Sequence, residues 1–163
     1  MRATIWGCRG TLASPGPETI RYGGQTSCIV LDLDDGSVVI LDAGTGIRPY
    51  GMSLAGVHPP KVDLLITHLH ADHIEGLRFF SPFWDPQVEF RIWGPPAQLK
   101  GLEQRMAPFF APPCFPVHRR DVPSRPQFRE VPGAPWTIVS ATVSAEPTYT
   151  PWVSQCAEMH RMA

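Results

Sequence analysis

A short run of histidines with one aspartate, residues 67–73, contains the side chains best suited to chemistry. Half of the chain's six histidines fall within six positions of this segment. Residues two apart in an extended stretch point the same way, so His68 and His70 can present their imidazoles to one point. Where the chain then turns into a helix, Asp72 and His73 would project into the same crevice. Imidazole nitrogens and a carboxylate oxygen together suit a borderline cation such as Zn²⁺.

The same residues also have a purely structural interpretation. Asp72 could serve only as the cap of a helix, and an isolated histidine is usually a surface residue or a core residue whose hydrogen bonds are satisfied. The spacing His-x-His-x-Asp-His directly after an apolar run favours a metal site over that interpretation.

The segments around this histidine run are short and apolar, which is typical of strands in a buried sheet. Residues 26–34 and 37–41 are β-rich runs separated by Asp35-Gly36, a strong hairpin signal. Residues 62–67 form a third run that ends at the histidines, and residues 88–93 alternate at period two. The histidine run therefore follows a strand and precedes a helix, which is where α/β sheets usually build their sites.

Two helices are expected after the third strand. The first spans residues 72–80, with Asp72 as its cap and Glu75 as the capping-box partner. The second spans residues 97–106.

The second half of the chain is rich in proline. Residues 107–135 contain eight prolines, which predicts an irregular covering segment with one short strand near residues 128–130. Residues 136–146 return to β character.

Composition limits the classes of protein to which the chain can belong. The 163 residues, with 43% hydrophobic side chains and a net charge of −1, suit one globular domain and exclude avid, charge-driven binding to nucleic acid. The four cysteines lie far apart, which indicates reduced thiols in a cytoplasmic protein. No segment approaches the ~20 apolar residues of a membrane span, so no membrane partner is expected.

The histidine run resembles the His-x-His-x-Asp-His signature of the metallo-β-lactamase-fold hydrolases. The glycine-rich segments 7–10, 22–28 and 41–46 extend the resemblance toward the branch of tRNA-processing ribonucleases and small phosphodiesterases. The resemblance covers residues 1–147 and implies an α/β domain of the αββα sandwich type, with residues 148–163 as a divergent C-terminal tail.

The family resemblance also implies a role for each site residue. His68 and His70 would bind a first metal and Asp72 and His73 a second, with Asp72 as the catalytic group that orients the attacking water. Asp42 would accept a hydrogen bond from a ligand imidazole and fix its tautomer; its structural alternative is a strand-end residue satisfied by the following turn. The implied cofactor is one or two Zn²⁺ or other divalent ions, and the implied substrate is a small molecule, a nucleotide or another phosphodiester.

The later ligands of the family are not identifiable in this sequence. Near residue 146, where the family has a His beside Pro or Gly, the chain reads Glu146-Pro147-Thr148. We therefore expect a C-terminally truncated member with an incomplete second sheet, whose exposed edge could lead to homo-oligomers. The first functional hypothesis is a metal-dependent, phosphodiesterase-like hydrolase; the alternative is a catalytically disabled metal-binding or interaction protein, so whether the chain is an enzyme stays open.

Overall fold

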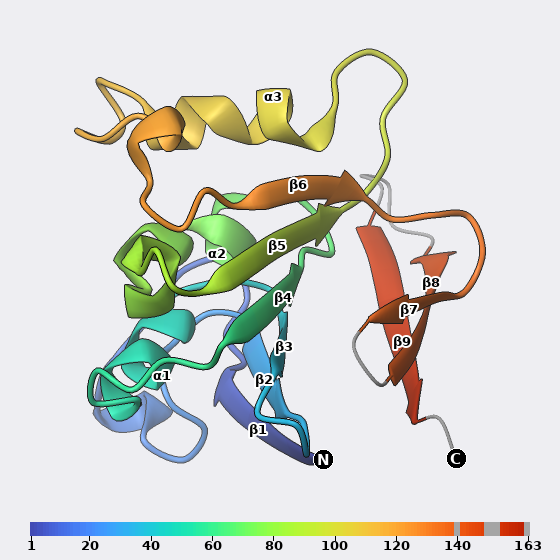
Figure 1. The fold of residues 1–163 in the computed structure, drawn as a ribbon. Helices are drawn as coiled ribbons and strands as arrows, with labels where there is room; N and C mark the ends of the chain where they lie inside the picture. Colours follow the sequence, from blue (N-terminus) through green and yellow to red (C-terminus); the bar gives the residue numbers. More distant parts are fainter. Residues whose placement is uncertain (139–140, 149–153, 162–163) are drawn as a thin grey trace.

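A six-stranded sheet carries the histidine run in the computed structural model, which describes residues 1–138, 141–148 and 154–161 (Figure 1). In spatial order its strands are β1 (Arg2–Gly7), β2 (Cys28–Asp32), β3 (Val38–Leu41), β4 (Lys61–Leu65), β5 (Glu89–Gly94) and β6 (Gln127–Glu130). The pairs β1–β2 and β2–β3 are antiparallel, and β3 to β6 are parallel. Because parallel strands end at the same edge of a sheet, the loops after β3, β4 and β5 lie together.

The hairpin between β2 and β3 confirms the turn expected at Asp35-Gly36. Gly36 adopts a φ of 82°, in the left-handed region that favours glycine. The Asp35 carboxylate accepts a hydrogen bond from the amide of Ser37 at 3.0 Å. This turn fixes the register in which Val30 lies opposite Ile40.

Short helices cover one face of the six-stranded sheet (Figure 1). The α-helices are α1 (Ile47–Ser53), α2 (Ala71–Ile74) and α3 (Leu102–Met106). The 3-10 turns are η1 (Pro17–Thr19), η2 (Leu77–Phe79), η3 (Ser81–Trp84), η4 (Ala107–Phe110) and η5 (Arg119–Asp121). The main core lies under this layer, where the side chains of Phe80, Phe83, Phe90 and Phe110 are almost fully buried. None of the helices in the described residues has the length and apolar character of a membrane span.

The helix expected over residues 72–80 is wrong in length and in its cap. It is only the single turn α2, its N-cap residue is His70 rather than Asp72, and Glu75 lies at its C-terminal end. The backbone bonds needed to continue it go elsewhere: the His73 carbonyl accepts from the amide of Ala43 at 2.7 Å, and the Gly76 amide donates to the Ala43 carbonyl at 2.9 Å. The loop after β3 thus takes the place of a second helical turn.

The second predicted helix is also shorter than expected, and several elements were not predicted. The structure has α3 beginning after Gly101, and η4 follows it directly. Residues 154–161, expected to be part of a divergent tail, form a strand that pairs with residues 141–148. Also unpredicted are β1 at the sheet edge and α1 after the glycine-rich loop of residues 44–46. The last two pack around Trp6 and Tyr50, whose rings lie 5.5 Å apart.

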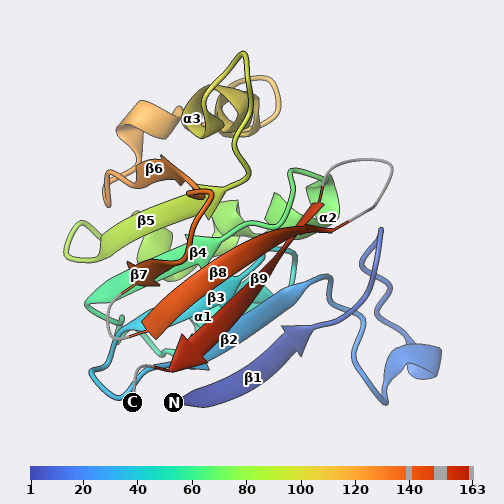
Figure 2. The same ribbon diagram turned by 90° about the vertical axis from the view of Figure 1, so that its right-hand side faces the viewer.

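A second, antiparallel sheet packs on the opposite face of the first. It consists of β7 (Trp136–Ile138), β8 (Ala141–Thr148) and β9 (Ser154–Arg161), in that order. Figure 2 shows β8 and β9 crossing in front of the strands of the first sheet. A small core cluster, which includes Val39, Leu65, Trp93, Ile138 and Val143, joins the two layers. Helices on one face of a six-stranded sheet and a second sheet on the other confirm the expected fold class, whereas the division at residue 147 stays a prediction.

Candidate functional site

The loop from the end of β4 to α2 brings the three imidazoles of the histidine run together. The ring centroids of His68 and His70 lie 4.4 Å apart, and those of His68 and His73 lie 4.1 Å apart. The Nε2 atom of His68 is 3.0 Å from Nδ1 of His70. His70 has an extended backbone, with φ −67° and ψ 151°, and the chain turns into α2 directly after it. An extended step followed by one helical turn therefore gathers three side chains that are two and five residues apart.

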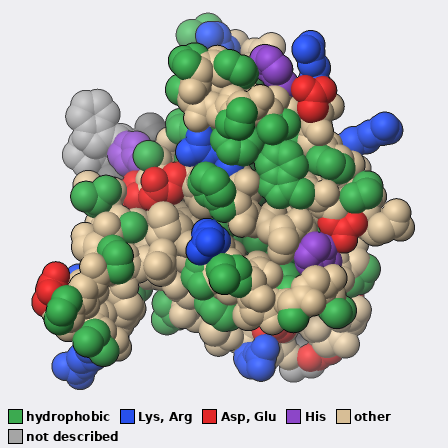
Figure 3. All heavy atoms as spheres, turned by 90° about the vertical axis from the view of Figure 1, so that its left-hand side faces the viewer, with side chains coloured by type: hydrophobic (Ala, Val, Ile, Leu, Met, Phe, Trp, Pro, Cys, Tyr) green, Lys and Arg blue, Asp and Glu red, His purple; other side chains and the backbone are tan. Residues whose placement is uncertain are grey.

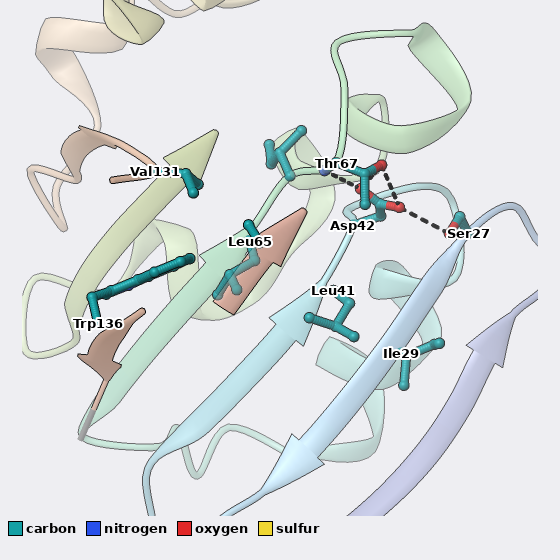
Figure 4. Close-up of a pocket in the computed structure, with 10 residues that line it drawn as sticks. Ser27, Ile29, Leu41, Asp42, Leu65, Thr67, Val131 and Trp136 are labelled. Carbon is teal, nitrogen blue, oxygen red and sulfur yellow. Dashed lines mark hydrogen bonds between the residues drawn. The ribbon is translucent and has the colours of Figure 1, made fainter. Parts of the chain in front are cut away.

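Asp42, at the end of β3, holds the histidine run against the sheet. Its Oδ2 lies 2.7 Å from Nδ1 of His73, and its Oδ1 accepts hydrogen bonds from the Thr67 amide and hydroxyl, both at 2.9 Å. Ser27 donates a further hydrogen bond to Oδ2 at 3.2 Å, as the close-up in Figure 4 shows. Asp42 is 4% exposed and has a φ of +59°, a conformation that aspartate tolerates better than most residues. The carboxylate is thus buried, positioned and fully hydrogen-bonded.

The environment drives the pKa values of two imidazoles apart. For His68, burial and then the neighbouring imidazoles of His73 and His70 hold the pKa below its usual value. For His73, burial acts in the same direction, but the hydrogen bond to Asp42 and the nearby carboxylates outweigh it and raise the pKa. With its Nδ1 proton donated to Asp42, His73 has only Nε2 available for another partner.

Asp72 faces that second nitrogen of His73. Its Oδ2 lies 3.4 Å from His73 Nε2 and accepts a hydrogen bond of 2.8 Å from the backbone amide of Thr11. Thr11 lies 61 residues earlier in the chain and has a φ of +68°. Sequence reasoning missed Thr11, because a backbone amide leaves no trace in the residue type.

Two glycines let the site loops approach one another closely. A Cβ atom at Gly44 would lie 2.2 Å from the Asp72 carbonyl oxygen, and one at Gly76 would lie 2.1 Å from the Gly44 carbonyl oxygen. Any side chain at these positions would push α2 away from the loop after β3. The positions of Asp72 and His73 therefore depend on residues that carry no functional group.

The possible metal-binding atoms lie in two pairs, one from His73 and Asp72 and one from His68 and His70. Two atoms bound tetrahedrally to one Zn²⁺ at ~2.0–2.1 Å lie about 3.4 Å apart, and the distance between His73 Nε2 and Asp72 Oδ2 matches this value. The His68 and His70 nitrogens, at 3.0 Å, are slightly closer. Within the described residues no group of three or more His, Cys, Asp or Glu side chains could hold a metal ion. Each pair is thus short of the three protein ligands typical of a catalytic zinc site.

Two cavities lie beside the histidine run. An open one of about 330 Å³ is lined by His68, His70, Arg105 and the prolines that follow β5. A smaller one of about 150 Å³ lies behind Asp42 between the two sheets, with mainly apolar walls such as Leu65 and Trp136 (Figure 4). Of the two, the open cavity is the one through which a substrate can reach the imidazoles.

Known proteins resemble this chain in sequence and in fold. A ribonuclease Z from Mycobacterium sp. (strain KMS) is 32% identical over 146 residues, which cover 83% of this chain and 49% of that protein. A diphosphatase from the PhnP family superposes with a TM-score of 0.65 at 17% identity, covering 96% of this chain and 61% of that one. Zn²⁺-bound PqqB from Methylobacterium extorquens superposes with a TM-score of 0.59 at 19% identity, covering 97% and 59%.

The matches cover most of this chain but only part of each relative. The chain spans about half the length of the curated relatives it matches. The two structural matches share less than a fifth of their residues with it, and therefore show its fold alone. The family model of the metallo-beta-lactamase superfamily matches residues 21–148, most of the chain and all of the histidine run. The chain belongs to the metallo-β-lactamase superfamily.

Proposed function

We propose that this chain is a metal-dependent hydrolase that cleaves phosphodiester bonds in a nucleotide or another small substrate. The observation that carries the proposal is the convergence of the histidine run at the ends of β3 and β4, beside an open cavity. The similarity to a ribonuclease Z, and to the fold of a diphosphatase, supports phosphodiesters as the substrate class.

His68, His70, Asp72 and His73 are the proposed metal ligands, and Zn²⁺ is the proposed ion. A zinc-bound protein of the same fold supports that choice of metal. When bound, such an ion lowers the pKa of a coordinated water and polarises the phosphoryl oxygen. The lowered pKa of His68 keeps that imidazole neutral near pH 7, the form in which a histidine binds metal.

Asp72 and Asp42 have different proposed roles. Asp72 is the catalytic residue, whose carboxylate orients the attacking water. The Thr11 amide donates a hydrogen bond to one oxygen of this carboxylate and so fixes its orientation. Asp42 is a positioning residue, which fixes the tautomer of His73 so that Nε2 faces outward.

A second candidate function is metal binding without turnover. It is favoured by one observation: among the described residues no three potential ligands surround a single point. A site with one weakly held ion would lack the second metal that clamps a phosphodiester between two ions.

Zinc content and turnover separate the two functions. We expect purified protein to retain zinc and to hydrolyse bis(p-nitrophenyl) phosphate, with turnover lost on chelation and restored by added zinc. His70→Ala should abolish tight zinc binding and turnover, whereas His118→Ala, a histidine outside the run, should change neither. Zinc without turnover would establish the second function, and zinc retained by His70→Ala would refute the ligand assignment.

A further inference from the structure

A third cavity, of about 410 Å³, opens on the helical side of the molecule. Its walls come from α1 and from the segment that follows α2, and they include Gln25, Arg48, Glu75, Arg78 and Phe79. Figure 3 views the molecule from the side that these short helices cover, where hydrophobic side chains surround isolated Lys or Arg groups. This volume is within the ~300–1,000 Å³ range of small-molecule sites. The cavity shares no lining residue with the one beside His68 and His70.

Two arginines give this helical-side cavity donors for an anion. Arg48 is exposed, and within the part of the chain that the structure describes its side chain makes no hydrogen bond or ion pair. Arg78 donates through Nη1 to the Cys114 carbonyl at 3.1 Å, but its buried Nε has no partner among the described residues. The acidic residue in the lining is Glu75, so the positive charges outnumber the negative one.

A planar apolar surface lies beside these donors. The Phe79 side chain is 58% exposed although it lines the cavity. Its ring packs edge-on against Phe115 at 6.3 Å, which holds the ring in place without covering it. The Arg78 guanidinium lies 5.9 Å from the Phe79 ring and 5.3 Å from the Phe115 ring, so cation and aromatic surface form one unit.

We propose that the helical-side cavity binds a nucleoside monophosphate unit. Guanidinium groups match the geometry of a phosphate, and the donors of Arg48 and Arg78 would take it. An exposed aromatic ring offers a stacking platform for any base, which Phe79 would supply. Gln25 adds an amide that can bond to a base or sugar edge. The site goes beyond the proposed hydrolase function, because it needs neither a metal ion nor any residue of the histidine run.

Binding of 5′-AMP to the full chain in the presence of EDTA tests the site directly. We expect calorimetry to show one binding site for 5′-AMP, with weaker binding of adenosine and of inorganic phosphate, each of which uses half of the cavity. Amide NMR signals of Gly76 and Phe79 should shift on titration. A single-stranded RNA trinucleotide that binds more tightly than 5′-AMP would identify the unit as part of RNA; weaker binding would identify it as a free nucleotide.

Variants assign the binding to the named residues. Arg48→Gln should weaken 5′-AMP binding about tenfold, since it removes a charge-assisted contact. Phe79→Ala should weaken it roughly five- to tenfold through loss of stacking. Arg21→Gln is the matched control, because Arg21 is also exposed and lies 5.0 Å from an aromatic ring, that of Tyr22, outside the cavity. No binding of 5′-AMP, equal effects of all three variants, or shifts confined to the histidine run would overturn the proposal.

Discussion

Two His–Asp pairs lie at opposite ends of the parallel strands and have the same Nδ1–Oδ2 distance. His73 and Asp42 follow β4 and β3 at the carboxyl ends of the strands, with 2.7 Å between Nδ1 and Oδ2. His58 and Asp85 precede β4 and β5 at the amino ends, again with 2.7 Å between the same atoms. The pair distance therefore cannot distinguish a functional site from a structural contact.

The surroundings of the two pairs are what differ. The Asp42 side chain is 6% exposed and accepts further bonds from Thr67 and Ser27, whereas that of Asp85 is 27% exposed. On the imidazole side, the second nitrogen of His73 faces Asp72, whereas that of His58 is buried and has no partner among the described residues. A His–Asp pair becomes a candidate site when the second imidazole nitrogen faces a further side chain that could bind a metal ion.

One member of each pair has a shifted pKa, and in both cases the shift favours the charged form, but the two contributions to stability are lost in different pH ranges. The pKa of His73 is raised, so its contribution to stability is present at low pH and is lost as the pH rises through the raised value. The pKa of Asp85 is lowered by hydrogen bonds from the Gln87 amide and from His58. Its contribution is present above the usual carboxyl pKa and is lost as the pH falls through the lowered value.

Replacing the carboxylate of the first pair should have the largest effect. In Asp42→Asn an amide replaces the group that accepts the His73 Nδ1 proton, so that the imidazole can move its proton to Nε2 and lose a metal-binding nitrogen. We expect zinc affinity to fall about 10–100-fold, the cost typical of losing such a partner. A competition titration against a zinc-binding dye measures it.

The matched control is the same substitution in the second pair. Asp85→Asn should leave zinc affinity unchanged, because His58 and Asp85 precede β4 and β5, at the opposite end of the strands from the histidine run. Equal losses in the two variants would mean that both act through general stability, and the distinction between the pairs would fail.

The loop after β3 packs closely against α2 at Gly44. In Gly44→Ala the new Cβ would lie 2.2 Å from the Asp72 carbonyl oxygen, so α2 must shift. We expect a loss of about 1–3 kcal/mol in the free energy of unfolding, measured by urea denaturation, together with weaker zinc binding. Gly133→Ala is the control, since nothing lies within 4 Å of a Cβ built there. A Gly44→Ala variant as stable as Gly133→Ala would show that the site loops are not tightly packed.

The sequence predicted which side chains form the site around the histidine run better than it predicted how the backbone positions them. The histidine run and the strands before it were recognisable because apolar runs and chemically active side chains both leave a pattern in residue types. Thr11 left none, because it contributes a backbone amide. The capping role expected of Asp72 was wrong because that carboxylate is bonded to Thr11 and faces His73 instead of closing its own helix.

Tertiary contacts account for the other differences between expectation and structure. The periodicity of residues 72–80 is helical, but bonds to Ala43 replace the second turn, and local pattern contains no information about them. The edge strand β1 was missed because its residues are mostly exposed and show no strong alternation. Conversely, the β character of residues 136–146 was recognised, although it belongs to two strands, β7 and β8, rather than one.

The pH dependence of the second pair is the smallest effect expected, because the Asp85 carboxylate is partly exposed and screened by solvent. Asp85→Asn should lower the unfolding free energy near neutral pH, where the wild-type carboxylate is charged and holds His58. The difference from wild type should shrink as the pH falls through the lowered pKa of Asp85. Once protonated, the carboxyl group is uncharged and accepts the hydrogen bonds from the Gln87 amide and His58 less strongly. Urea denaturation at a series of pH values measures it, with Asp121→Asn as an exposed control. A difference that instead grew toward acid pH would mean that the Asp85 pKa is raised, and that its hydrogen bonds do not favour the charged carboxylate.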